Sequence, residues 1–392
     1  MPPYPTVRLK PREGRRVRSG APWAFSNELE MNAAVRALKP GSAVNLSGDD
    51  GQVLGSGYFN PNSLIAVRLL DREPDVAFDA AFFERRLARA RLLRDSIFEK
   101  PFYRLVNAEG DGLPGLTIDR FGESCVIQIT TAGMECLVEP LLRGLEEAIA
   151  PAHVMLRADS PVRTLEGLPA YVRAAKGAAG RIVVEENELR YFAEPGGGQK
   201  TGWYYDQRDN RAFMARLAPG RSVLDAFCYT GGFALVAAKA GAREVVALDS
   251  SEHALALAEQ SAALNGQTAK FVKCDVFDEF ERLAASNETF DAVIADPPPF
   301  VKSRKDLEAG ARAYRKLARL ASGLVSRQGF LLLASCSHNI SCERFAQECA
   351  LGIRRAGRDA RLIRQAGAGA DHPTHPMLPE SAYLKTLVYA LD

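Results

Sequence analysis

The stretch Ser222–Gly241, SVLDAFCYTGGFALVAAKAG, decides the fold of this chain. Its first part, Val223 to Phe227, is a short apolar run of the kind that forms a buried strand. The turn from Cys228 to Gly232 follows, and the alanine-rich run from Phe233 to Ala240 predicts a helix that ends at Gly241. A strand, a glycine turn and a helix in this order place backbone N–H groups at the carboxyl edge of a sheet, where nucleotide-like ligands bind.

The same alternation of strand and helix continues toward the C-terminus. Four further apolar segments predict strands, and they are Glu244–Asp249, Phe271–Asp275, Phe290–Asp296 and Phe330–Ser335. Strands that alternate with helices predict an α/β fold with a parallel, doubly wound sheet. Acids end three of these segments and Cys336 follows the fourth, so we expect the functional edge of the sheet there.

The acidic residues at the strand ends limit the kinds of ligand that this edge of the sheet can bind. The dinucleotide pattern G-x-G-x-x-G is missing after the first strand. Asp249, at the end of the second strand, suits the hydroxyls of a ribose, and Asp275 is placed to reach the exocyclic amine of the same adenosine. A ligand with ribose and adenine but no pyrophosphate is S-adenosylmethionine. The alternative is that Asp225 and Asp249 only cap helices and that Asp275 is solvated.

Length and composition limit the number of domains and the class of protein to which the chain can belong. The 392 residues predict two or three domains, and 47% hydrophobic with 25% charged residues is typical of globular proteins. Seven cysteines without a C-x-x-C pair favour reduced thiols and argue against a disulfide framework or a zinc site. Neither a membrane-length apolar run nor the apolar core of a signal peptide occurs in the sequence. We therefore expect a cytoplasmic protein with no metal and no membrane partner.

Residues 1–75 predict a small β-barrel with a basic loop. Short apolar segments with turn signals between them, from Ser42 to Leu70, indicate its strands. Six of the first 20 residues are basic, and Glu13 is the single acidic residue in the same stretch. Basic side chains near an aromatic ring suit contacts with phosphates and stacking on a base. We predict that Arg15, Arg16 and Trp23 bind RNA, and the alternative is a solvated arm.

Residues 76–180 predict a central α/β domain, and residues 181–392 form the last domain. A helical stretch from Asp79 to Glu99 opens the central domain, and the Gly/Ala-rich stretch 174–180 is its expected linker. One side of this helix holds Arg85, Arg86, Arg89, Arg91 and Arg94, a pattern that a surface helix explains. The last domain begins with a hairpin and a glycine-rich loop, and Lys200 and Thr201 follow that loop. The loop is expected either to close over a bound ligand or to serve only as a connection between domains.

Several motifs resemble those of a known protein family. They are KTGWYYDQRDNR (200–211), DAFCYTGGFAL (225–235), DPPPFVKS (296–303), SCSHNI (335–340) and ADHPTHP (370–376), with PWAFS (22–26) and AEGDGLPGLTIDRF (108–121) in the first half. The set resembles a bacterial 23S ribosomal RNA methyltransferase family that makes 5-methylcytosine. The resemblance covers nearly the whole chain and implies a PUA domain, a central α/β domain and a Rossmann-like class I methyltransferase domain that uses S-adenosylmethionine.

The resemblance also implies a chemical mechanism. Carbon 5 of cytosine is a poor nucleophile, and a thiolate that adds to carbon 6 makes the ring able to accept a methyl group. Cys336 would be the nucleophile and Asp296 the partner of the ring N3, because neighbouring strands lie about 4.8 Å apart. The alternative for Cys336 is a buried, small apolar residue. His338 and a water molecule are candidates for the base that removes the carbon-5 proton, and we expect His372 and His375 in a loop beside the pocket.

The same motifs contain the residues expected around the methyl donor. They are Lys200, Thr201, Gln207, Asp225, Phe227, Tyr229, Thr230, Gly231, Asp249, Ser250, Asp275, Val276 and Asp296. Two rival hypotheses stay open: a methyltransferase that acts on a guanine or adenine nitrogen through DPPP, with Cys336 incidental, and a non-catalytic RNA-binding protein on a methyltransferase scaffold. The expected partner is ribosomal RNA, and the sequence leaves a homodimer open.

Overall fold

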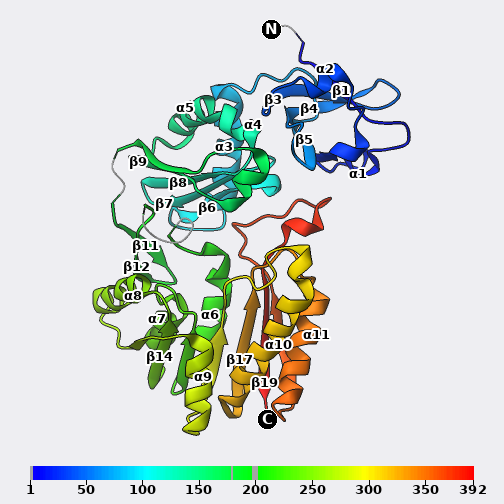
Figure 1. The fold of residues 1–392 in the computed structure, drawn as a ribbon. Coiled ribbons are helices and arrows are strands. Elements are labelled where there is room, and N and C mark those ends of the chain that lie inside the picture. The colour runs from blue at the N-terminus through cyan, green and yellow to red at the C-terminus, as the bar shows by residue number, and fades with distance from the viewer. Residues whose placement is uncertain (1–2, 178–179, 197–201) are drawn as a thin grey trace. The chain divides into compact units, whose positions relative to one another are not determined.

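The computed structural model describes residues 3–177, 180–196 and 202–392, and the chain divides into two compact units (Figure 1). The first unit comprises Met1–Ile182, Glu194–Gly202 and Ala370–Ser381. The second comprises Val183–Ala193, Trp203–Gly369 and Ala382–Asp392. The first two predicted domains therefore belong to one compact unit, and their boundary at residue 75 stays a prediction.

A seven-stranded sheet in the order β15-β14-β13-β16-β17-β19-β18 forms the centre of the second unit. Its strands are β13 (Ser222–Ala226), β14 (Glu244–Asp249), β15 (Lys270–Lys273), β16 (Phe290–Ala295), β17 (Val325–Ser335), β18 (Ala360–Ala366) and β19 (Lys385–Leu391). The five predicted strands are confirmed and run parallel. Strands β18 and β19 were not predicted from the sequence, and β19 runs antiparallel to both of its neighbours.

Helices cover both faces of this sheet (Figure 1). On one face lie α9 (Val276–Ala285), α10 (Leu307–Gly323) and α11 (Cys342–Arg355), and on the other α6 (Arg208–Leu217), α7 (Gly232–Lys239) and α8 (Glu252–Leu264). Val293 and Ala295 of β16 pack into the first core, whereas Ala292 and Ile294 pack into the second. Successive strand residues point to opposite faces, and burial on both faces explains why the strand sequences are continuously apolar.

The β11–β12 hairpin (β11 Ile182–Glu186, β12 Leu189–Ala193) precedes this sheet in the chain. The Phe192 backbone N–H donates to Ser261 Oγ on α8 at 2.9 Å. Buried Glu186 accepts from Trp203 Nε1 at 3.0 Å and from Arg211 of α6 at 2.5 Å. Because Arg211 is itself buried, this charge pair anchors α6 to the hairpin.

The first unit contains two five-stranded sheets. The order of the first is β1-β3-β4-β5-β2, from β1 (Thr6–Arg8), β2 (Trp23–Phe25), β3 (Ser42–Ser47), β4 (Val53–Phe59) and β5 (Ile65–Asp71). The order of the second is β10-β9-β8-β7-β6, from β6 (Phe102–Asn107), β7 (Leu116–Phe121), β8 (Ser124–Ile129), β9 (His153–Ala158) and β10 (Tyr171–Lys176). Three short helices, α1 (Arg15–Arg18), α2 (Ala33–Arg36) and α4 (Ala132–Cys136), accompany them.

Helices α3 (Ala80–Asp95) and α5 (Val138–Ile149) pack on the second sheet through one apolar core. Asp79 caps α3, because its Oδ1 accepts from the Phe82 backbone N–H at 2.9 Å. The predicted linker at 174–180 is wrong in its first part, since residues 174–176 pair with β9 as part of β10. The Ala-Ala-Lys sequence of residues 174–176 gave no sign of this pairing, because β10 is an edge strand with exposed side chains.

The prediction that all five arginines of α3 lie on a solvent face is also wrong. Arg94 is fully buried, and its guanidinium donates two hydrogen bonds to Asp111, at 2.6 and 2.8 Å. The same group donates to the backbone carbonyl of Asp371 at 2.8 Å. A buried charge persists only when it is paired and hydrogen-bonded, so this network ties the 370–381 segment to the first unit.

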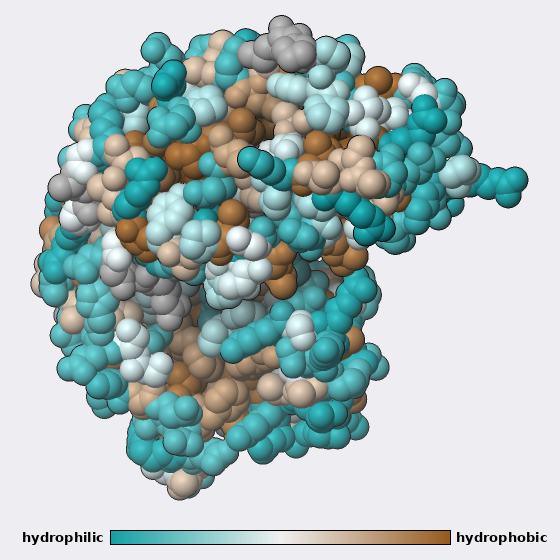
Figure 2. All heavy atoms as spheres, turned by 45° about the horizontal axis from the view of Figure 1, so that its top comes forward, coloured by the Kyte–Doolittle hydropathy of each residue, from teal (hydrophilic) through white to brown (hydrophobic). Residues whose placement is uncertain are grey.

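The exposed apolar side chains are spread over several parts of the chain, among them Leu64, Leu92, Leu165 and Leu362. On the face in Figure 2, hydrophobic residues lie in small groups among hydrophilic ones. Among the residues that the structure describes, no helix has the length and apolar character to cross a bilayer.

Candidate active site

The turn between β13 and α7 has a strained backbone. The φ angles of Phe227, Tyr229 and Gly231 are 62°, 50° and 79°, in the left-handed region that residues with a Cβ rarely adopt. The Tyr229 backbone N–H donates to Asp249 Oδ2 at 2.9 Å, and Ala234 N–H of α7 donates to Asp225 Oδ2 at 2.8 Å. Acids of two adjacent strands therefore fix the turn, and strain of this kind persists only where the surroundings impose it.

Asp225 supports the turn from inside the sheet. Its side chain is 1% exposed, and burial raises its pKa to about 8, an effect that the hydrogen bond from Ala234 partly offsets. This shift favours the neutral form of the carboxyl group. This position agrees with a helix-capping role, and direct contact of Asp225 with a ligand stays a prediction.

Asp249 and Asp275 also bind backbone amides. Asp249 Oδ1 accepts from the Ser251 N–H at 2.8 Å, and Asp275 Oδ1 accepts from the first turn of α9, from Phe277 N–H at 2.8 Å and Asp278 N–H at 3.2 Å. Asp275 is exposed and both of these bonds go to one oxygen. A carboxylate has about four lone-pair sites, so both acids retain acceptor capacity for a ligand.

Asp296 and Cys336 come directly after the neighbouring parallel strands β16 and β17, and both are half-buried. The hydroxyl of Tyr204 interacts electrostatically with both. Burial raises the pKa of Tyr204, and the charges of Tyr229 and Asp206, then of Cys336 and Asp296, raise it further. The predicted pair is thus brought to one place, with a neutral phenol beside it that sequence analysis did not single out.

Buried Gln207 contacts Asp296. Its Nε2 donates to Asp296 Oδ2 at 2.9 Å, and its Oε1 accepts from Asn210 Nδ2 at 2.7 Å. Asn210 Nδ2 also donates to Thr386 Oγ1 of β19 at 3.1 Å. This series of hydrogen bonds determines which end of the Gln207 amide is the oxygen and which is the nitrogen. Its position is suited to orienting Asp296, and the predicted contact of Gln207 with the methyl donor stays a prediction.

Lys385 is the second residue that sequence analysis missed. It lies on β19 opposite Ser335, is 7% exposed, and its Nζ donates to the carbonyls of Ser337 at 2.5 Å and Tyr383 at 3.0 Å. Burial lowers the pKa of Lys385, and the nearby Cys342 and Cys336 thiols oppose that shift. A lysine inside the apolar run LKTLVYAL was the available signal, because lysine is almost never buried without a partner.

The chain was compared with known proteins. The sequence pattern described as a PUA-like domain matches residues 7–72, and that described as an S-adenosylmethionine-dependent methyltransferase matches residues 170–389. "Ribosomal RNA large subunit methyltransferase I" of Shewanella amazonensis is 37% identical over 390 residues, which are 97% of this chain and 98% of that protein. The protein of the same name from Cronobacter sakazakii is 36% identical over 372 residues, 93% of each chain. This chain belongs to the S-adenosylmethionine-dependent methyltransferase family.

Solved structures show the same fold. A putative SAM-dependent methyltransferase from Streptococcus mutans has a TM-score of 0.84 at 20% identity, and the match covers 98% of this chain and 100% of that one. A putative methyltransferase complexed with SAH has the same score, identity and coverage. This methyltransferase therefore has a PUA-like domain followed by a Rossmann-like domain, and its cofactor is S-adenosylmethionine.

The strand ends of the methyltransferase suit that cofactor. The carboxylates of Asp249 and Asp275 can accept hydrogen bonds, and their contacts with the ribose hydroxyls and the adenine amine stay predictions. The Phe277 ring lies 6.2 Å from Phe227 and 6.1 Å from Phe300, an aromatic wall beside Asp275. Ser250 is exposed, whereas the side chains of Val276 and Thr230 are buried at 4% and 1% exposure. Lys200 and Thr201 lie outside the described residues.

The histidines of the methyltransferase lie in different places. His338 is exposed, with its ring 5.2 Å from that of Tyr383, whose hydroxyl donates to Asp206 at 2.6 Å. His372 and His375 belong to the 370–381 segment of the first unit, and their expected place in a loop beside the pocket stays a prediction. In the described part of the chain, no group of three or more His, Cys, Asp or Glu residues is arranged to hold a metal ion.

The predicted RNA contacts lie in the first unit. Arg16 pairs with Glu380 at 2.7 Å, and half-buried Trp23 donates from Nε1 to Glu109 Oε1 at 3.0 Å. Arg15 is exposed and forms no ion pair with any residue that the structure describes. The role of these three residues in RNA binding stays a prediction, and Arg16 would have to exchange an acid for a phosphate.

We expect Asp249→Ala to weaken binding of S-adenosylmethionine by about 1.5–3 kcal/mol, the range for hydrogen bonds to a charged group. Calorimetry on the purified protein measures this, and Glu259→Ala, an exposed carboxylate on α8, is the matched control. Thermal unfolding separates a lost ligand contact from a collapsed turn, since Asp249 also holds the Tyr229 amide. A folded variant with wild-type affinity would remove Asp249 from the cofactor site.

Proposed function

We propose that this methyltransferase forms 5-methylcytosine in 23S ribosomal RNA through a covalent adduct with Cys336. Relatives named as ribosomal RNA large subunit methyltransferases support the substrate, and the PUA-like domain is consistent with it. The observation that favours cytosine carbon 5 is the placement of a thiol and an acid, Cys336 and Asp296, after neighbouring strands. The protein would act in the cytoplasm, together with the ribosomal RNA.

The chemistry requires a cytosine flipped out of its stack. The Cys336 thiolate adds to carbon 6, and N3 receives a proton from Asp296, which leaves carbon 5 nucleophilic. S-adenosylmethionine supplies a methyl group bound to an electrophilic sulfonium. A base then removes the proton from carbon 5, the C6–S bond breaks to release the thiolate, and N3 returns its proton to Asp296. His338 is a candidate for this base, because it is exposed at the end of the same strand.

Two further residues support this chemistry. Gln207 donates a hydrogen bond to Oδ2 of Asp296 and so fixes the orientation of this carboxyl group. The Lys385 ammonium, held by the Ser337 and Tyr383 carbonyls, places positive charge next to Cys336. A nearby cation favours the thiolate, which is the reactive form of cysteine. A methyltransferase acting on a base nitrogen needs neither the thiol nor this lysine.

Methyl transfer from labelled S-adenosylmethionine to ribosomal RNA, followed by nucleoside analysis, tests the proposal. The expected product is 5-methylcytidine, and bisulfite mapping of 23S RNA from a strain without the protein locates it. A methylated guanosine or adenosine would replace the proposal with the base-nitrogen activity. Absence of any methylated product would favour the non-catalytic RNA-binding protein.

Lys385→Met is expected to move the pH dependence of Cys336 alkylation by iodoacetamide to higher pH, by about one pH unit. Removing a cation disfavours the thiolate, so a higher pH is needed for the same thiolate fraction. Mass spectrometry of the peptide that contains Cys336 separates it from the other six cysteines. Lys270→Met, at the exposed start of β15, is the control, and coincident curves for wild type and Lys385→Met would contradict the role.

A further inference from the structure

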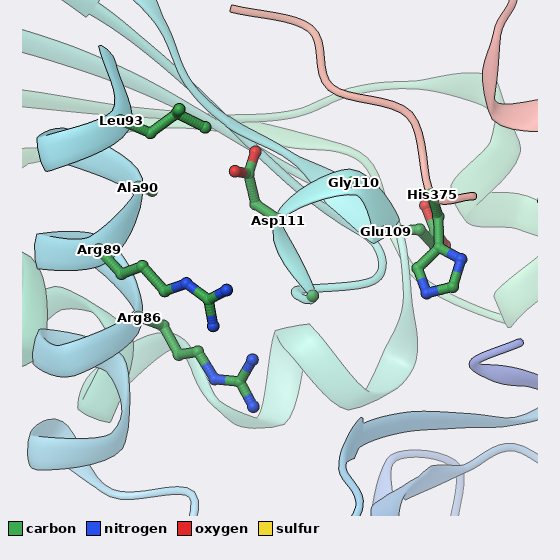
Figure 3. Close-up of a pocket in the computed structure, with 9 residues that line it drawn as sticks. Arg86, Arg89, Ala90, Leu93, Glu109, Gly110, Asp111 and His375 are labelled. Atoms are coloured by element: carbon green, nitrogen blue, oxygen red, sulfur yellow. The ribbon is translucent and has the colours of Figure 1, made fainter. Parts of the chain in front are cut away.

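Helix α3 borders a cavity of about 400 Å³ in the first unit, which the proposed reaction does not use (Figure 3). The opposite wall is the turn that includes η2 (Ala108–Asp111) and Gly112, and His375 lines the cavity next to Glu109. Arg86 and Arg89 extend from α3 toward this turn. All of these residues belong to the same compact unit. The volume lies in the range of small-ligand sites.

The two arginines of the cavity are held differently. Arg86 is fixed, because its Nη2 donates to the Leu70 carbonyl and to Asp71 Oδ2, both at 2.9 Å, and its guanidinium lies 5.2 Å from the centre of the Phe82 ring. Arg89 is exposed and has no hydrogen bond or ion pair to any residue among those described. One guanidinium is therefore pre-positioned, and the other has its full charge available for a ligand.

The acids at this cavity already have partners. Both oxygens of Asp111 accept from Arg94, at 2.6 and 2.8 Å, and its Oδ2 also accepts from the Asn107 backbone at 2.6 Å. Glu109 Oε1 accepts from Trp23 at 3.0 Å. In Figure 3 the Asp111 carboxylate points away from the guanidinium groups of Arg86 and Arg89. Glu109 keeps its negative charge because Trp23 is a neutral donor, so the part of the cavity suited to an anion is the space in front of the two arginines.

His375 and Gly112 complete the wall. His375 Nδ1 accepts from the Met377 N–H at 3.1 Å, and burial lowers its pKa, so the neutral ring has its proton on Nε2, a donor. Gly112 has a φ of 70°, and a Cβ there would lie 3.0 Å from Arg86 Nη1. Glycine adopts this backbone conformation without strain and leaves Arg86 in place. Guanidinium and imidazole donors around a small cavity are a typical set for a phosphate group.

We propose that this cavity binds a phosphate of the RNA backbone through Arg86 and Arg89. The inference rests on the proposed RNA substrate, and it is independent of the methylated base and of Cys336. The phosphate sits between the two guanidinium groups, opposite the Gly110–Gly112 turn, and Leu93 and Ala90 leave room for the attached sugar. Such a contact positions the RNA and does not read its sequence.

RNA binding by Arg89→Gln tests the inference, with Arg85→Gln as the matched control. Arg85 is an exposed arginine on the same helix that does not line the cavity. We expect Arg89→Gln to lower the affinity for a ribosomal RNA fragment roughly 10-fold and to reduce the slope of log K against log salt by about one. Arg85→Gln should leave both near wild type, and the affinity for S-adenosylmethionine should not change in either variant.

Inorganic phosphate and 5′-AMP distinguish an RNA phosphate from a free nucleotide. Saturable 5′-AMP binding that Arg89→Gln abolishes, with unchanged RNA affinity, would overturn the inference in favour of a small-molecule site. Equal losses in Arg85→Gln and Arg89→Gln would also overturn it, since they would reflect general surface charge. If the wild-type protein does not bind RNA at all, the failure lies with the proposed function.

Discussion

The Cys336→Ala variant is expected to lose methyl transfer by at least about 10³-fold and to keep its affinity for S-adenosylmethionine. The sulfur forms the bond that makes carbon 5 nucleophilic, so no other group replaces it. Cys336 is half-buried and follows β17 directly, and alanine fits this position without a clash because it only removes an atom. Initial rates with labelled methyl donor and calorimetric titration of the donor measure the two quantities.

RNA with 5-fluorocytosine at the target provides an independent readout. Fluorine cannot leave carbon 5 as a proton does, so the wild-type protein should remain covalently bound to the RNA, visible as a shifted band under denaturing conditions. Cys336→Ala should form no such band, and Cys136→Ala, which removes an exposed cysteine of the first unit, should form it normally. A Cys336→Ala variant that methylates at a rate near wild type would favour the base-nitrogen activity.

Asp296→Asn is expected to lower kcat about 10²- to 10⁴-fold, the range for loss of a general acid. Asparagine keeps the size of the side chain and an oxygen that can accept from Gln207, but it has no proton to give to N3. The KM for RNA and the affinity for the methyl donor should change little, because the acid acts on the ring during the reaction.

Gln207→Ala separates positioning from acid catalysis. This variant keeps the Asp296 carboxyl group and loses the hydrogen bond that orients it, so we expect a smaller loss of kcat than in Asp296→Asn. Thermal unfolding is needed as well, since Asn210 would lose its acceptor on Gln207.

Wild-type kcat in Asp296→Asn would mean that N3 is protonated by another group or not at all.

The local pattern of the sequence was enough for the sheet of the second unit and for its reactive edge. Strands and helices differ in hydrophobic period, and the carboxyl ends of parallel strands meet at one edge. Asp296 and Cys336 could therefore be predicted as neighbours although β17 and α10 intervene in the chain. Asp225, Asp249 and Asp275 were predicted at this edge in the same way. Their hydrogen bonds to backbone amides were not predictable from the sequence and are seen only in the structure.

Tertiary packing alone decided the contacts between distant segments. Lys385 reaches the Ser337 carbonyl because β19 enters the sheet antiparallel beside β17, and the apolar pattern of a strand does not specify its partner. Gln207 was predicted at the cofactor from its motif, and it meets Asp296 only through the packing of α6 and the preceding turn. Arg94 was expected on the surface from its charge. It is buried because Asp111 and the Asp371 carbonyl, far apart in sequence, together satisfy its guanidinium, and such compensation depends on three-dimensional proximity that no local pattern contains.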